Sequence, residues 1–351
     1  MTEVDTSASP LARLFAQRRL RVEAGRVRGS GRPTGEELAT LDSGALLVPL
    51  LASGVAVVGG ADARPFLHGQ LANDVTGLAV GGVTRSLMLN HKGHALAEAA
   101  VLRRTGDLLL AVDDGQLGPL LTSLERHVVF DEVNLAGQPD WLLLTLQGGG
   151  ATQVLERLGG ELPAERAFSL TQVAGLVSYS YRRARSAAGG YDLLVGPTGP
   201  GAVAAQVGQL LAELQDAGAT LTGEDALDAA RVLAGIAGAA SEAGEGVLPQ
   251  EAGLEAALSY RKGCYLGQEI MARIEARGNL KRSLARLALS GRPAGAGENG
   301  RALVAGGRVV GVLGTVAELP DGSLGALAVI RADLPDGAAV EVGGIEGRLT
   351  R

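Results

Sequence analysis

Apolar and polar residues along this 351-residue chain follow two patterns, one before and one after about residue 280. Before it, short apolar runs predict strands, and apolar residues spaced three and four apart predict helices. This mixture predicts packed antiparallel sheets covered by helices, an α+β fold. The expected strands are 54–58, 85–89, 95–103, 107–112, 128–135, 141–146, 175–182 and 191–195, and the expected helices are 61–71, 117–126, 151–158, 203–216, 223–234 and 268–277.

After residue 280 the apolar runs become shorter and are separated by Gly, Pro and Asp. Turn residues at this spacing predict an all-β module, a small barrel.

The first 44 residues are rich in arginine and polar side chains. Residues 11–28 have the spacing of a basic amphipathic helix, and residues 29–35 have the composition of a linker. We expect a solvated, partly ordered extension here, with a nucleic-acid-binding arm as the alternative. The chain is therefore predicted to comprise this extension (1–44), two α+β domains (45–145 and 146–280) and the barrel (281–351).

Composition limits the classes of function. The net charge of −6 gives no general attraction to nucleic acid or anionic membranes. No apolar stretch approaches the roughly 18 residues of a membrane span, and the first residues lack the apolar region of a signal peptide. A single cysteine excludes an internal disulfide and a four-cysteine metal site within one chain. We expect a monomeric cytoplasmic protein that holds no metal and contacts neither membranes nor nucleic acid directly.

Only three of the 32 basic residues are lysines, and they stand at positions 92, 262 and 281. Each is a candidate for a role that needs a compact ammonium group, with chance as the alternative. Lys262 is the most informative because the only cysteine, Cys264, lies two residues later.

The surroundings of Cys264 suit a reactive thiol. An ammonium group near a thiol favours the thiolate, and the N-terminus of the helix expected over 268–277 acts in the same direction. Gly263 and Gly267 let the backbone approach a ligand closely or adopt a positive φ. We therefore predict Cys264 as the reactive group and Lys262 as its partner, and the alternative is that Cys264 is a small buried hydrophobe.

The segment around Cys264 resembles the K-G-C-F/Y-x-G-Q-E signature of the YgfZ family. The matching residues are Lys262, Gly263, Cys264, Tyr265, Gly267, Gln268 and Glu269, and the resemblance continues at Arg273, Ile274, Arg277 and Gly278. Segments 66–75 (FLHGQLANDV), 89–93 (LNHKG), 231–236 (RVLAGI) and 248–251 (LPQE) also resemble family segments. The resemblance extends from about residue 50 to the C-terminus.

This resemblance implies the fold of the glycine-cleavage T protein, in which two mixed α/β domains and a small C-terminal β-barrel surround a central channel. It implies that tetrahydrofolate, or a one-carbon derivative of it, lies in that channel. It also implies a role in the assembly or repair of iron–sulfur proteins, linked indirectly to tRNA modification, in which Cys264 is required. Iron–sulfur proteins or their assembly factors are the implied partners.

Candidate folate contacts follow from the resemblance and from side-chain chemistry. Arg231 stands where the T-protein pattern has a folate-contacting arginine. Glu251, Asn90 and Asn73 offer carboxylate and amide groups that can pair with a pterin edge. For the two asparagines, a turn or a helix cap is the alternative.

The sequence departs from the T-protein pattern where that family has an acidic pair. Those positions hold Ala97 and Glu98, and Arg85 replaces a tyrosine of the pattern. Without the acid, aminomethyl transfer lacks its general catalyst unless Glu98 substitutes for it. Three functions stay open: a folate-dependent accessory factor, a folate-dependent one-carbon transferase, and a folate-binding scaffold without chemistry. Asp113 and Asp114 are expected to cap the helix that follows them.

Overall fold

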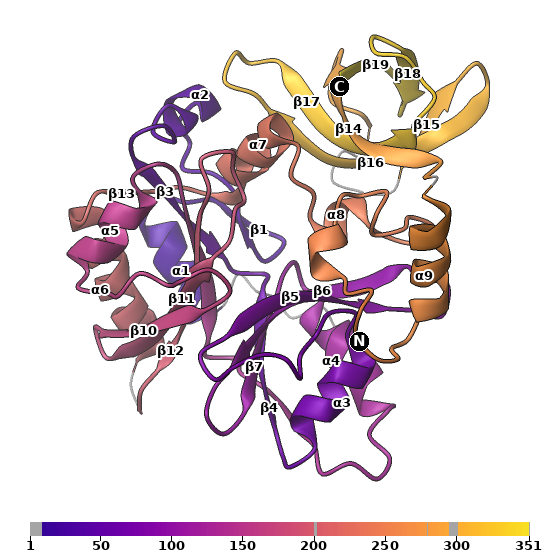
Figure 1. Cartoon of the computed structure of the whole chain (residues 1–351). Helices are drawn as coiled ribbons and strands as arrows, with labels where there is room; N and C mark the ends of the chain where they lie inside the picture. Colours follow the sequence, from indigo (N-terminus) through magenta and orange to yellow (C-terminus); the bar gives the residue numbers. More distant parts are fainter. Residues whose placement is uncertain (1–8, 200–201, 279, 295–300, 351) are drawn as a thin grey trace.

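The computed structural model describes residues 9–199, 202–278, 280–294 and 301–350. It contains two mixed α/β layers and a closed C-terminal barrel, which lies at the top of the view in Figure 1. The predicted α+β class and the predicted barrel are confirmed. In the described parts of the chain, no helix is both long and apolar enough to cross a bilayer.

The first sheet is antiparallel and has the strand order β5-β6-β7-β4-β8. Helices on one face bury Leu67 and Leu120 against Leu110 of the sheet. The strands are β4 (Gly54–Gly59), β5 (Val83–Leu89), β6 (Ala95–Arg103), β7 (Leu108–Val112) and β8 (Asn134–Gly137), and the helices are α3 (Ala63–Gln70) and α4 (Leu117–Glu125).

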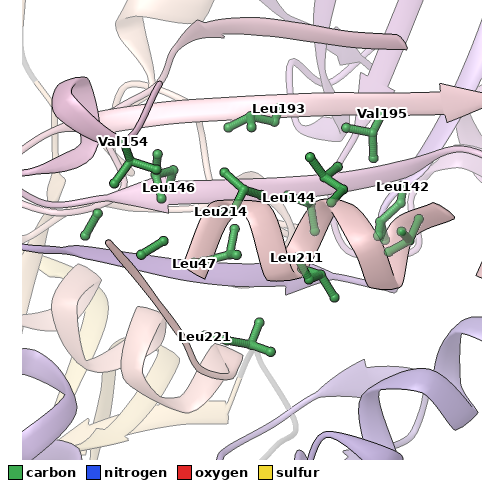
Figure 2. Close-up of a cluster of buried hydrophobic side chains, with 14 of the residues drawn as sticks. Leu47, Leu142, Leu144, Leu146, Val154, Leu193, Val195, Leu211, Leu214 and Leu221 are labelled. Carbon is green, nitrogen blue, oxygen red and sulfur yellow. The ribbon is translucent and has the colours of Figure 1, made fainter. Parts of the chain in front are cut away.

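The second sheet has the order β10-β11-β12-β9-β3-β13 and is antiparallel except for the β13–β3 pair. Its strands are β3 (Ala45–Leu50), β9 (Leu142–Gln147), β10 (Phe168–Val173), β11 (Leu176–Arg182), β12 (Gly190–Pro197) and β13 (Ala219–Leu221). The helices α5 (Ala151–Arg157) and α6 (Val203–Asp216) pack on it. Figure 2 shows Leu47, Leu144 and Leu193 of the sheet close to Leu211 of α6 in this core.

The order of the chain does not follow the order of the sheets. Strand β3 precedes the whole first sheet but pairs with β9, with Leu47 opposite Leu146. Strands of the second sheet therefore come both before and after the first sheet in the sequence, so residue 145 does not separate the strands of one sheet from those of the other. The proposed division at residues 45, 146 and 281 stays a prediction.

The C-terminal barrel closes in the order β14-β17-β16-β15-β18-β19. Helix α7 packs Leu227 and Val232 against Leu327 and Ala317 of the barrel. The strands are β14 (Arg282–Leu289), β15 (Arg301–Ala305), β16 (Arg308–Glu318), β17 (Leu324–Arg331), β18 (Ala339–Val342) and β19 (Ile345–Thr350). The segment before the barrel holds α7 (Glu224–Ala234), α8 (Ala239–Glu242), the short 3-10 helix η2 (Glu255–Ala257) and α9 (Gln268–Arg277).

The N-terminal segment differs from its prediction. Helix α1 (Pro10–Gln17) is short, and a hairpin of β1 (Val22–Glu23) and β2 (Arg26–Val27) follows it, then α2 (Thr34–Leu38). The helix over 11–28 is wrong because Arg19, Ala24 and Gly25 have positive φ, which a helix cannot contain. The solvated extension is also wrong for residues 9–40, since Phe15 and Val27 are fully buried in the core of the second sheet. Residues 1–8 lie outside the described part of the chain.

The other differences are local. The strand expected over 128–135 begins only at Asn134, because the preceding loop leaves Val129 and Phe130 exposed. Strands β3, β10, β13 and β19 were not predicted as separate elements.

Candidate functional site

Buried and half-buried charged side chains gather where the two sheets approach the segment after α7. We call Arg85, Glu98, Asp113, Arg183, Arg185 and Asp192 the central charge cluster. Five of them, all except Asp192, line a cavity of about 30 Å³, which is also bounded by residues 236–239. Charges this deep are stable only when they are paired and hydrogen-bonded.

Glu98 joins the two sheets within this cluster. It lies on β6, and its Oε1 accepts hydrogen bonds from Arg85 Nε at 2.6 Å and Arg183 Nη1 at 2.8 Å. The carboxylate is buried. Among the described residues, Oε2 of Glu98 accepts no hydrogen bond, so this oxygen is available to a ligand.

Arg185 binds two carboxylates at once. Its guanidinium lies 2.9 Å and 3.0 Å from the two oxygens of Asp113, and 3.0 Å and 2.7 Å from those of Asp192. Burial raises the pKa of Tyr181, whose hydroxyl donates to Asp192 at 3.4 Å. Burial alone would also raise the pKa of Asp113, but Arg185 holds it below its usual value.

The predicted capping role of Asp113 and Asp114 is wrong. Gln116 stands at the N-cap of α4, and no side chain caps the helix. Asp113 instead binds Arg185, and Asp114 binds Arg26 at 3.1 Å.

Arg26 connects the N-terminal hairpin to the cluster. It reaches Asp114, which lines the cavity, and Glu224 at the start of α7, with an Nη2–Oε2 distance of 2.5 Å. Burial raises the pKa of Glu224 to about 7, although Arg26 opposes the rise. The segment predicted to be solvated therefore lies behind the cavity, in contact with Asp114 of its wall.

A larger pocket of about 840 Å³ shares Arg85 with the small cavity. We call it the entrance pocket. It lies at the edge of both sheets, where Gly82 forms a bridge with Ala167. Its lining residues are Asn73, Val83, Thr84, Arg85, Glu165, Arg166, Tyr181, Arg182, Ala256 and Leu258.

Lys262 binds the cysteine loop to the C-terminal end of α3. Its Nζ donates to the backbone oxygens of His68, Leu71 at 2.5 Å and Asn73 at 3.4 Å, at the C-terminal end of α3. The ammonium also lies 4.8 Å from the centre of the Tyr265 ring. Burial lowers the pKa of Lys262 to about 8. These contacts make Lys262 an anchor of the loop, and its predicted partnership with the thiol stays a prediction.

Cys264 is exposed on this loop, which contradicts the alternative of a small buried hydrophobe. Tyr265, one residue later, is buried, and burial raises its pKa to about 12. Gly263 is exposed as well. The loop therefore presents its thiol to solvent while Lys262 and Tyr265 hold it in place.

The rest of the motif forms the start of α9. Gly267 has a φ of +83°, and a Cβ there would lie 2.8 Å from the backbone oxygen of Asn90. Backbone N–H of Gln268 donates to Tyr265 O at 3.2 Å. Glu269 and Arg273 form an exposed ion pair at 2.7 Å. The turn at Asn90 and the motif are thus packed together, as the glycine requires.

The predicted folate contacts already have protein partners. Arg231 binds Glu242 at 2.6 Å and Asp228 at 3.1 Å and lines the small cavity. Glu251 binds Arg282 at 2.6 Å, away from the cluster. The structure therefore brings Arg231 near Glu98 but leaves Glu251 elsewhere.

Asn90 forms the turn that was left open as its alternative, whereas Asn73 bridges distant backbone segments and forms neither a turn nor a helix cap. Oδ1 of Asn90 accepts from the backbone N–H groups of Lys92 and His94, which closes a turn. Nδ2 of Asn73 donates to the backbone oxygens of Arg85 at 2.8 Å and Ala256 at 3.2 Å. Asn73 still lines the entrance pocket, and its role as a ligand contact stays a prediction.

Sequence reasoning missed Arg183, Arg185 and Asp192. A usable signal was present, because three arginines occur within residues 182–185 directly after a strand. Arginines in such a run need carboxylate partners if they are buried. The partners come from distant parts of the chain, so only the tertiary structure identifies them.

Comparisons with known proteins agree with this fold. A family model described as the GCVT N-terminal domain matches residues 28–262, more than half of the chain. A tRNA-modifying protein YgfZ from Yersinia enterocolitica is 29% identical over 295 residues, which cover 81% of this chain and 83% of that protein. A mitochondrial aminomethyltransferase from Mesembryanthemum crystallinum is 29% identical over 225 residues, 60% of this chain and 54% of that protein. The chain thus spans about half the length of this plant enzyme.

A solved structure extends the comparison to the whole chain. Aminomethyltransferase T of the glycine cleavage system from Bartonella henselae has a TM-score of 0.79 and 19% identity, covering 98% of this chain and 96% of that one. At this identity the likeness concerns the fold alone. The matching family model, the YgfZ relatives and the shared fold together establish that the chain belongs to the GCVT N-terminal domain family, as a YgfZ/GcvT-like protein.

Proposed function

We propose that the protein binds a reduced folate in the entrance pocket, against the central charge cluster, and supports the assembly or repair of iron–sulfur proteins through Cys264. The contact of the entrance pocket with the central charge cluster, through Arg85, carries the first part of this proposal. The pocket's 840 Å³ lies within the range of about 300–1,000 Å³ typical of small-molecule sites. The neighbouring cavity of 30 Å³ has no room for such a ligand.

The lining of the entrance pocket suits a pterin. Val83 and Leu258 provide apolar walls, while Thr84 and Arg85 provide donors. Behind Arg85, Oε2 of Glu98 is the acceptor without a partner among the described residues. A planar heterocycle with acceptors on one edge can use the Thr84 and Arg85 donors, whereas Glu98 lines the small cavity behind Arg85 and not the entrance pocket. A bound folate would supply the one-carbon carrier, and these residues would bind and orient it.

Calorimetric titration with tetrahydrofolate and its formyl derivative tests this site. We expect micromolar binding that weakens about tenfold or more in Ala256→Phe, because the ring fills the pocket from an exposed position. Arg85→Gln should weaken binding as well. Arg126→Gln removes an exposed charge elsewhere and is the matched control. No binding by the unchanged protein, or equal binding by Ala256→Phe, contradicts the folate site.

The exposure of Cys264 supports its proposed role towards a protein partner. A thiol on the surface can reach a partner's cluster, which a buried thiol cannot. We expect Cys264→Ala to abolish complementation of a deletion strain while the melting temperature stays unchanged. Normal complementation by this variant would show that the function does not need the thiol, and it would favour a folate-binding scaffold without chemistry.

A folate-dependent one-carbon transferase is the second candidate, and the open oxygen of Glu98 favours it. A carboxylate beside the ligand can accept or deliver a proton. Release of ammonia and methylenetetrahydrofolate from an aminomethyl-lipoyl carrier is the assay. Turnover by the unchanged protein that is lost in Glu98→Gln would establish this activity. Absence of turnover with a pure carrier protein would rule out the transferase.

A further inference from the structure

A separate cavity of about 420 Å³ lies between the N-terminal segment, α7 and the barrel. We call it the α2 pocket, because Glu37 of α2 lines it together with residues of the segment 21–34, of α7 and of β16. A Cβ on Gly35 of α2 would lie 2.7 Å from the backbone oxygen of Pro320, so the helix contacts the barrel directly. Of the described residues, none lines both this pocket and the entrance pocket.

The α2 pocket contains a buried carboxylate that lacks a cationic partner. Glu37 is only 2% exposed, and its Oε1 accepts hydrogen bonds from the hydroxyls of Ser30 and Thr222, the latter at 2.5 Å. Within the described part of the chain, Glu37 forms no ion pair and its Oε2 accepts no hydrogen bond. A buried charge is stable when it is paired, so this oxygen can take a cationic donor from a ligand in the pocket.

The aspartates of the same pocket are already paired with arginines. Asp225 binds Arg28 at 3.3 Å, and Asp228 binds Arg231 at 3.1 Å. These pairs neutralise one another, which leaves the charge of Glu37 to be balanced by a ligand.

Two arginines of the α2 pocket form no ion pair with any other described residue. Arg32, in the segment before α2, donates through its side chain to Leu221 O at 3.4 Å, and Arg292 lies in the connection between β14 and β15. Both are exposed, as is Glu318 on β16, so the mouth of the pocket carries a net positive charge. Guanidinium groups bind carboxylates in a planar, two-pronged geometry.

We propose that the α2 pocket binds a free α-amino acid. The ammonium group of this zwitterion donates to Oε2 of Glu37, and its carboxylate binds Arg32 and Arg292. A zwitterion supplies both missing charges at once, whereas an anion would leave Glu37 unpaired and an amine would leave the arginines unpaired. The volume of the pocket lies in the range of small-molecule sites.

Thermal-shift measurements on the full chain with each of the standard L-amino acids test this site. We expect at least one of them to raise the melting temperature in proportion to the logarithm of its concentration, because it binds the folded state. Calorimetry then compares this amino acid with the amine that lacks its carboxylate and the acid that lacks its ammonium group. Each analogue should bind about tenfold or more weakly, since it loses a charge-assisted contact.

Substitutions assign the contacts. Glu37→Gln keeps an acceptor for the two hydroxyls but removes the charge, and it should weaken binding about tenfold or more. Arg32→Gln changes an exposed side chain and leaves the fold intact, and it should weaken binding of the amino acid but not of the matched amine. Glu36→Gln is the matched control, because Glu36 is exposed on the same helix and does not line the pocket, so full affinity is expected.

Three results would overturn the amino-acid site. They are the absence of a melting-temperature rise with every amino acid, unchanged affinity in both Glu37→Gln and Arg32→Gln, and a matched amine that binds as tightly as the amino acid. The folate site proposed above would stand in each case, because it uses a different pocket.

Discussion

Lys262 shows how a single side chain of the motif can serve the fold. Its ammonium is surrounded by backbone oxygens at the end of α3 and by the Tyr265 ring. The C-terminal end of a helix carries partial negative charge, which an ammonium stabilises. Arginine could not place one compact charge among these oxygens, which explains a lysine in a chain that otherwise uses arginine.

We predict that Lys262→Met lowers the free energy of unfolding by about 1–3 kcal/mol, because it leaves partly buried carbonyl groups without a donor. It should also make the loop 259–266 more sensitive to proteolysis. Denaturant titration and limited proteolysis measure the two effects. Lys92→Met, at an exposed turn position, should change stability by less than about 0.5 kcal/mol. Equal effects of the two substitutions would contradict the anchoring role.

Arg185 is the residue with the largest predicted effect on stability. Arg185→Met leaves Asp113 and Asp192 without their shared partner, and removal of one member of a buried ion pair costs about 3–5 kcal/mol. Arg273→Met breaks only the exposed pair with Glu269 and should cost less than about 1 kcal/mol. Chemical denaturation of both variants gives the comparison. A small decrease in the free energy of unfolding of Arg185→Met would show that the central charge cluster is solvated.

At the scale of elements, the N-terminal hairpin contacts the site from behind, where Arg26 binds Asp114 of the cavity wall. The turn between β1 and β2 uses Ala24 and Gly25, both with positive φ, which matches the twist of a tight hairpin. This turn places Arg26 on Glu224 at the start of α7. A Cβ on Gly223 would lie 1.6 Å from the backbone oxygen of Arg28, so the segment and the helix are in direct contact.

The buried Glu224 predicts a pH dependence of stability. Its pKa is raised from 4.5 to about 7 on folding, mainly by burial, so the folded state binds more protons between these values. Stability should therefore fall as pH rises from about 4.5 to 7, by up to about 3 kcal/mol from this group. Glu224→Gln should flatten that part of the pH profile. Urea titrations of both proteins at pH 5 and 7.5 measure the change in the free energy of unfolding between these pH values. An equal change in the two proteins would contradict the assignment of this pH dependence to Glu224.

At the scale of the whole molecule, Glu242 joins α7 to the barrel. One oxygen binds Arg231 of α7 at 2.6 Å, and the other accepts from the backbone N–H and hydroxyl of Thr315 on β16. Gly314 lies so close that a Cβ there would approach this carboxylate within 2.6 Å. The T-protein-like position of Arg231 therefore has a structural use in this chain.

We predict that Glu242→Gln destabilises the protein by about 2–4 kcal/mol, because it removes the charge that balances buried Arg231. Calorimetry should show a lower melting temperature. Glu318→Gln, an exposed change on the same barrel strand, should leave it within about 1 °C. Equal melting temperatures for Glu242→Gln and the unchanged protein would contradict a role for Glu242 in holding α7 against the barrel.

Elements with a clear period were predictable from the sequence. Helix α9 begins and ends where its spacing predicts, and β6 does as well. Strand β3 was missed because all six of its residues are buried, so no alternation marks it. The prediction of a helix over 11–28 was wrong. The spacing of its basic residues fits the solvated face of a helix, but the chain turns at Arg19, which has a positive φ.

By itself, the sequence determined the α+β class, the terminal barrel and the segment that carries Lys262 and Cys264, because these depend on local periods and on rare residues close together. The tertiary structure alone decided which charges share the centre. Glu98, Asp113, Arg185 and Asp192 come from separate strands and loops, and buried ion pairs form between groups that folding brings together, whatever their distance in the sequence. It also decided that the N-terminal segment packs against the site, since Arg26 in this basic stretch is half-buried between Asp114 and Glu224, two carboxylates that are distant in the sequence.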